Sequence, residues 1–267
     1  MNAFTTHLAY EFRATLRDKT QLLMNYLFPL FFFVMMGLLM GKVNPTFKET
    51  MIPGMILVAV MSSTLLGMPG PMLSSRETGI FRSFKINGVP SISIILIPIL
   101  NVLLHMVLVS IMITIAGSLF FGGVLPANWF QFALVWLVSF LAFSGLGMLI
   151  GVVASNSRAT ILIAQLIFVP SMILGGLMMP ASMLPESLGM IAKLLPTGHA
   201  MDAFAFLSSN QTAQAEGYFQ LGLLLVTGIL ALGLSSYLFH WDNSIKRRRP
   251  ALLGLSVLVP FVISLAF

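Results

Sequence analysis

The chain contains no cysteine, and only 8% of its 267 residues are charged. The absence of cysteine excludes disulfides, thiolate metal sites and cysteine nucleophiles. The scarcity of charge excludes an ordinary soluble domain, because such domains carry about 25% charged residues. Since 58% of the residues are hydrophobic, most of the surface must face hydrocarbon. The composition therefore predicts an integral membrane protein.

Signatures of catalysis are also missing. There is no Gly-x-x-x-x-Gly-Lys-Ser/Thr phosphate loop and no His-Glu-x-x-His metal pair. The stretch Ala142-Phe143-Ser144-Gly145 approaches the Gly-x-Ser-Gly of rhomboid-type proteases. However, alanine replaces the first glycine, and close helix contact at Gly145 is the simpler interpretation. We therefore predict no catalytic residue and no metal site in this chain.

Long apolar runs predict an all-α, polytopic bundle, because a helix needs roughly 20 apolar residues to cross a bilayer. No soluble insertion interrupts the runs, so we expect residues 1–267 to form one transmembrane domain. The six expected spans are Leu22–Met40, Ile52–Leu73, Ile92–Phe121, Trp129–Ala154, Thr160–Met179 and Phe219–Phe239. Only His105 is ionisable deep within a span, and we interpret it as a packing residue rather than a proton relay.

Two further apolar segments flank these spans. Residues 1–20 carry an apolar side chain every four positions, at Phe4, Leu8, Phe12 and Leu16. This pattern predicts an amphipathic helix at the membrane surface, with an ordinary solvated helix as the alternative. Residues 251–267 follow a basic cluster at 246–249 and reach about 25 Å as a helix. We favour a seventh crossing with the C-terminus outside, and a hairpin or surface helix is the alternative.

Lysine and arginine are distributed unevenly between the loops. With the N-terminus inside, eleven of the 14 fall on the cytoplasmic side, and only Lys42, Lys48 and Lys193 fall outside. Because positive residues hold loops in the cytoplasm, this asymmetry predicts a cytoplasmic N-terminus. The net charge of +6 has the same origin, so we do not expect nucleic-acid binding.

The loop at residues 74–90 concentrates charge around apolar side chains. Arg76, Glu77, Arg82 and Lys85 surround Ile80, Phe81 and Phe84. This composition predicts a short amphipathic helix that ends at Gly88 and Pro90.

The region 180–217 is too polar for a normal span. Pro180, Pro185 and Pro196 divide it into two short helical pieces. We expect either an external cap or a re-entrant pair, because irregular backbone at membrane depth requires partners from protein or water. Its candidate gating residues are Glu186, His199 and Asp202, with a solvated surface loop as the alternative.

The order of these features resembles the membrane subunit of a type-two ATP-binding-cassette (ABC) exporter. This permease family includes bacterial drug, polysaccharide and lipid-linked glycan exporters. The resemblance covers about residues 1–245. Besides the N-terminal helix and six spans, it rests on Glu77, Gly79, Arg82 and Pro90 in the family's Glu-x-Gly-(x)-Arg…Pro order, and on the hairpin Leu184-Pro185 through Leu195-Pro196.

The resemblance implies a pair of permeases in a bacterial plasma membrane, surrounded by lipid, with separate ATPase subunits that bind ATP and Mg on the cytoplasmic side. The implied ATPase-coupling residues are Arg76, Glu77, Gly79, Phe81, Arg82, Phe84 and Lys85. The short external loops favour a hydrophobic or amphipathic substrate, such as a drug, an antibiotic or a lipid-like compound. A stand-alone ion-coupled carrier or channel is the alternative, and a titratable carboxylate within a span would favour it.

Overall fold

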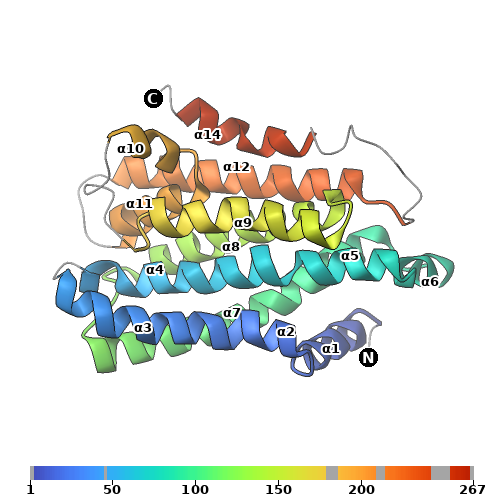
Figure 1. Ribbon diagram of the computed structural model, residues 1–267, viewed down its shortest axis with the longest axis horizontal. Helices are drawn as coiled ribbons and strands as arrows, with labels where there is room; N and C mark the ends of the chain where they lie inside the picture. Colours follow the sequence, from blue (N-terminus) through green and yellow to red (C-terminus); the bar gives the residue numbers. More distant parts are fainter. Residues whose placement is uncertain (1–2, 45–46, 179–185, 209–213, 242–252, 265–267) are drawn as a thin grey trace.

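The computed structural model describes residues 3–44, 47–178, 186–208, 214–241 and 253–264. These parts of the chain are helical and contain no strand. Six helices within them are long and apolar enough to cross a membrane, and they run in alternating directions along one bundle (Figure 1). The prediction of an all-α polytopic bundle is confirmed.

The six candidate spans have the following helices: α2–η1–α3 (Lys19–Leu22, Leu23–Leu27, Phe28–Val43), α4–η2–α5 (Phe47–Met61, Ser62–Gly67, Pro69–Glu77), α7 (Ser91–Phe121), α8 (Trp129–Val153), α9 (Ser157–Leu174) and α12 (Gln214–Leu238). The shorter helices are α1 (Ala3–Thr15), α6 (Ile80–Ile86), α10 (Glu186–Ala192), α11 (Pro196–Ser208), η4 (Leu255–Leu258) and α14 (Val259–Ser264). We call the two ends of the bundle the α6 end and the α10 end, after the short helices found there (Figure 1).

The N-terminal helix is a separate unit, as predicted, but it ends at Thr15, so Leu16 lies beyond it and is exposed. The first span begins at Lys19, three residues before the expected start. The Asp18 carboxylate explains this boundary, because it accepts hydrogen bonds from the backbone amides of Thr20 (2.8 Å) and Gln21 (3.1 Å). An aspartate in this position caps a helix N-terminus.

Polar and aromatic contacts hold α1 and the first span against α7. The ring of Phe12 stacks on His105 with centroids 4.4 Å apart, and the Tyr26 hydroxyl lies 2.5 Å from His105 Nδ1. Asn101 Nδ2 donates to Thr15 Oγ1 at 2.7 Å. His105 is fully buried among these partners, which agrees with its expected role in packing.

The second span, α4–η2–α5, has an apolar stretch that is almost entirely buried and lies at the centre of the bundle. Glycines of α8 bring neighbouring helices into close backbone contact. A β-carbon on Gly147 would lie 2.0 Å from the Thr64 carbonyl oxygen, and one on Gly145 would lie 3.0 Å from the Gly228 carbonyl oxygen. The Ser144 hydroxyl is buried and donates to the Leu141 carbonyl of its own helix. Residues 142–145 therefore serve helix packing here.

The fifth span ends at Leu174, five residues earlier than expected. The chain turns at Gly175 and Gly176, and Gly176 has a left-handed φ of +77°. A β-carbon on Gly175 would lie 2.1 Å from Thr197 Oγ1. The missing side chain thus allows α11 to approach the end of α9.

The C-terminal apolar segment runs along α12 from the α6 half of the bundle towards the α10 end (Figure 1). A β-carbon on Gly254 would lie 4.0 Å from the Leu149 side chain, and Phe261 stacks on His199. Its helical residues Leu255–Ser264 extend about 15 Å, which is half the thickness of the hydrocarbon core. Residues 242–252 and 265–267 lie outside the described chain, so the seventh crossing stays a prediction.

Candidate functional site

Helices α5 and α6 form an elbow at one end of the bundle. Helix α5 ends at Glu77, and Gly79 turns the chain with a left-handed φ of +76°. Helix α6 then runs from Ile80 to Ile86 and is followed by Gly88, whose φ is +73°. Residues with a β-carbon rarely adopt this conformation. The short helix predicted to end at Gly88 and Pro90 is therefore present, and Gly79 and Gly88 explain its observed limits.

The Arg76 side chain joins this elbow to α8. Its Nη1 donates to the Val152 carbonyl oxygen at 2.6 Å, and its Nη2 donates to the Ala154 carbonyl oxygen at 2.5 Å. The last carbonyls of a helix have no partner within the helix and attract cations. Arg76 therefore caps α8 within the chain, which differs from its expected place at the ATPase contact.

Phe81 also faces into the chain and differs from the expected docking role. It is buried, and its ring packs edge-on against Phe239, just beyond α12, with centroids 5.5 Å apart. Phe84 is partly buried on the same side, because positions three apart share a helix face. These rings cover the end of α12, which the sequence pattern alone does not reveal.

The surface of α6 exposes other side chains. Ile86 is 79% exposed and Ile80 is 45% exposed, while Glu77, Arg82 and Lys85 are exposed beside them. Ile86 was not among the expected coupling residues. Its position five residues after Phe81 places it on the opposite face of the helix, and this spacing was the signal available in the sequence.

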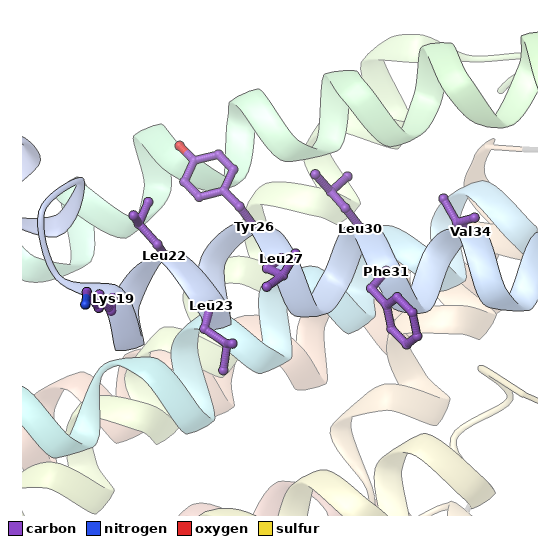
Figure 2. Close-up of a pocket in the computed structure, with 8 residues that line it drawn as sticks. All are labelled: Lys19, Leu22, Leu23, Tyr26, Leu27, Leu30, Phe31 and Val34. Carbon is purple, nitrogen blue, oxygen red and sulfur yellow. The ribbon is translucent and has the colours of Figure 1, made fainter.

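A groove of about 660 Å³ follows the outer face of the first span. Figure 2 shows two rows of side chains along it, and the lining residues are Lys19, Leu22, Leu23, Tyr26, Leu27, Leu30, Phe31 and Val34. Lys19 supplies the only charge in this lining and lies at one end. The remaining surface is apolar, except for Tyr26, whose hydroxyl points towards α7 and His105. The groove is thus an apolar surface with a positive charge at one end.

The region expected as an external hairpin contains two short helices, as predicted, and α11 begins at Pro196. Helix α11 packs beside α8 and α12, with the rings of Phe204 and Phe132 4.9 Å apart. Thr197 Oγ1 donates to the Ser171 carbonyl oxygen of α9 at 3.5 Å. Helix α11 is thus part of the bundle rather than a solvated loop. Residues 179–185 and 209–213 lie outside the described chain.

His199 connects three parts of this end of the bundle. Its Nε2 lies 2.7 Å from the Lys193 carbonyl oxygen, its Nδ1 contacts Gln220 Oε1 of α12, and its ring stacks on Phe261 with centroids 5.0 Å apart. The side chain is buried. The sequence did not identify Gln220 or Phe261 as its partners, because both are distant in the chain.

Asp202 lies near His199 and has an exposed side chain. The surrounding protein nevertheless removes enough water to raise the pKa of its carboxyl. His199 and Lys193 lower this pKa, and Glu216 raises it. Glu186 begins α10, and its side chain is not described. Within the described chain, no three His, Asp or Glu side chains come together as a metal site.

Six apolar helices define a polytopic membrane protein, with an elbow exposed at one end and an apolar groove along the first span. Residues 2–207 match the family model of the ABC-2 type transporters, and the chain belongs to this family. It is therefore a multi-pass membrane permease component that works with ATP-binding-cassette ATPase partners. No curated protein and no solved structure matches the chain. Helix α12 and the C-terminal segment lie beyond the matched residues.

Proposed function

We propose that this chain is the permease of an ATP-driven exporter in a bacterial plasma membrane, and that its substrates are hydrophobic or amphipathic compounds. The attachment of α6 to the bundle carries the proposal. Arg76 ties the elbow to the end of α8, and Phe81 ties it to Phe239 after α12. A movement of α6 is therefore transmitted directly to the second span through α5, to α8 through Arg76 and to α12 through Phe239. Coupling to an ATPase requires such a connection.

In this proposal the α6 end faces the cytoplasm, and an ATPase subunit with bound ATP and Mg docks on α6. The excess of lysine and arginine in the loops on that side supports the orientation. Ile80 and Ile86 would fill a groove on the ATPase, and the charged residues Glu77, Arg82 and Lys85 would surround them. Apolar anchors within a polar rim are typical of protein interfaces.

A second permease, identical or related, would cover the face formed by the first span and α9. These two helices are the least buried of the six candidate spans, and they meet where the Phe28 and Phe168 rings lie 6.1 Å apart. Phe31 on one side and Leu166 on the other are 65% and 72% exposed. The groove along the first span would then lie between the two permeases, with lipid against the remaining apolar surface.

The groove also supports the proposed class of substrate. Its lining is apolar apart from Lys19 and Tyr26, so it offers burial to a hydrocarbon chain or ring system and few hydrogen bonds. A drug, an antibiotic or a lipid-like compound has this character, whereas a sugar or an ion does not.

Docking can be tested by co-purifying the chain with its ATP-binding-cassette ATPase subunit. We expect Ile86→Asp to abolish co-purification and ATP-stimulated dye efflux, because it places a charge in a desolvated contact. Val43→Asp is a matched control, since Val43 is 73% exposed near the α10 end. It should leave co-purification intact. Equal complex formation by the two variants would contradict docking on α6.

A further inference from the structure

Two π-helical segments lie against each other inside the first two spans, η1 at Leu23–Leu27 and η2 at Ser62–Gly67. Each is followed by a proline, Pro29 or Pro69, two residues after its end. A proline has no amide hydrogen, and its ring collides with the carbonyl four residues earlier. A wider π turn relieves this collision, and such turns are frequent at functional sites.

Proline alone does not produce these two π segments. Pro53, Pro98 and Pro170 also lie inside helices, and those helices continue as α-helices around them. The two prolines with π turns differ in that their π segments contact one another. The two π segments thus occur together, at one contact between the first two spans.

Buried hydroxyl groups fill the contact between the π segments. Ser62 Oγ lies 3.1 Å and Ser63 Oγ 3.4 Å from the Met24 carbonyl oxygen, and Thr64 Oγ1 donates to the Val60 carbonyl oxygen at 2.7 Å. All three side chains are fully buried. Serine and threonine hydroxyls satisfy backbone groups that an irregular turn or a proline leaves free.

Asn25, at the centre of η1, is not satisfied in this arrangement. Its side chain is fully buried, and neither its Oδ1 nor its Nδ2 has a hydrogen-bond partner. A β-carbon on Gly67 would lie 3.6 Å from Asn25 Oδ1, so the amide faces the end of η2. A buried amide without partners is destabilising, and such a group in a native structure requires an explanation, for example as a reservoir of strain.

We propose that η1 and η2 form a joint, at which the α6 end of the first two spans rotates relative to the α10 end during the transport cycle. Shifting one residue between π and α turns rotates the helix beyond it by about 100°. In the rotated state the Asn25 amide pairs with the Ser62 and Ser63 hydroxyls, which here face Met24. The inference rests on the proposed function, because ATPase closure on α6 supplies the driving force.

The connections of the joint suit this motion. Helix α5 leads from η2 directly to the elbow, and Arg76 ties its end to α8. The joint thus lies between the ATPase contact and the α10 end of the central helix.

The rotation can be tested directly with Asn25→Leu in the complete transporter, which contains its ATPase subunit. Leucine has a similar shape and no unpaired polar atoms, so the melting temperature should rise by about 2 °C or more. It also removes the partner that stabilises the rotated state. Because coupling between sites typically amounts to 5–150-fold, dye transport per ATP should fall at least about fivefold. Co-purification with the ATPase should be unchanged.

Ser139→Ala is the matched control, since Ser139 Oγ is also buried without a partner but lies in α8, away from the joint. This variant should keep wild-type transport. Equal transport per ATP by Asn25→Leu and Ser139→Ala would contradict the proposal, and so would loss of folding in Asn25→Leu alone.

A distance measurement provides a readout that does not depend on transport. Spin labels at Thr50→Cys and Ser74→Cys lie on either side of η2, about 36 Å apart along the helix, and both positions are exposed. The distance should change when ATP is added to the complex, and Pro69→Ala should suppress that change, whereas Pro98→Ala should not. If the distance between the two spin labels stays constant in a complex that still transports dye, the proposed rotation at η1 and η2 is wrong, but the proposed function still stands. Absence of ATP-driven transport in the wild type would instead overturn the proposed function.

Discussion

The Thr64 carbonyl oxygen occupies the space beside Gly147 so completely that a β-carbon there would lie only 2.0 Å away. The obstacle is backbone of the buried central helix and cannot move aside as a flexible side chain would. The position thus requires glycine for a steric reason, and α8 depends on it for its place in the bundle.

Gly147→Ala should therefore destabilise the protein. Overpacking of a core typically costs 1–3 kcal/mol, and we expect a loss of about 3 kcal/mol or a failure to insert. Gly222→Ala in α12 is the control, because no atom lies within 4 Å of its β-carbon position. That variant should be neutral or more stable, since alanine favours helix. Thermal unfolding in detergent compares the two, and equal melting temperatures would contradict the close contact.

Replacing Arg76 tests its role as a cap of α8. Arg76→Met keeps the length of the side chain but removes both hydrogen bonds to the carbonyls of Val152 and Ala154. Hydrogen bonds to charged groups contribute about 1.5–3 kcal/mol each, so we expect a loss of about 2 kcal/mol and faster amide exchange at the end of α8. Arg158→Met, an exposed position nearby, should have little effect. Unchanged exchange in Arg76→Met would exclude the cap.

Asp202 should make stability depend on pH. Because its pKa is raised in the folded protein, the folded state holds the proton more tightly than the unfolded state does. The contribution of Asp202 to the free energy of unfolding should fall as pH rises from the pKa of its carboxyl in the unfolded state to the higher pKa in the folded state. Above that range the contribution should stay low. Asp202→Asn should thus raise the melting temperature at neutral pH and flatten its dependence in the acid range. Glu49→Gln is the control, because Glu49 is an exposed residue near the same end of the bundle. It should neither raise the melting temperature nor flatten its pH dependence.

The C-terminal segment should cross the membrane. Its start lies near Leu149, towards the α6 end of α8, and its Phe261 stacks on His199, near the α10 end. A reporter that works only in the cytoplasm should be active at the N-terminus and silent at the C-terminus. Activity at both ends would show a hairpin or a surface helix instead.

The sequence predicted the long helices well, because each apolar run is determined locally and needs only length and hydrophobicity. It predicted the short helix that ends at Gly88 for the same reason, because a glycine ends a helix locally. The turn at Gly79, where that helix begins, was not predicted. The sequence does not show which side of this short helix faces the bundle. Arg76 contacts the end of α8 and Phe81 contacts Phe239 just beyond α12, both far away in the chain. Their expected contact with an ATPase stays a prediction.

The π segments illustrate a second limit. Pro29 and Pro69 can be read from the sequence, but so can Pro53, Pro98 and Pro170, which lie in regular α-helices. The π segments before Pro29 and Pro69 contact each other, and this contact depends on tertiary packing. The same holds for His199, whose partners Gln220 and Phe261 come from two other helices.

The most direct test of the account is ATP dependence in reconstituted vesicles. The purified chain alone should neither hydrolyse ATP nor move an amphipathic fluorescent dye. With the transporter's ATPase subunit on the outside of the vesicles, ATP should drive dye into the lumen. Glu77→Lys should abolish this uptake, whereas Glu49→Lys should not. ATP hydrolysis by the isolated chain, or dye movement driven by an ion gradient without the ATPase, would contradict an exporter permease energised by a separate subunit.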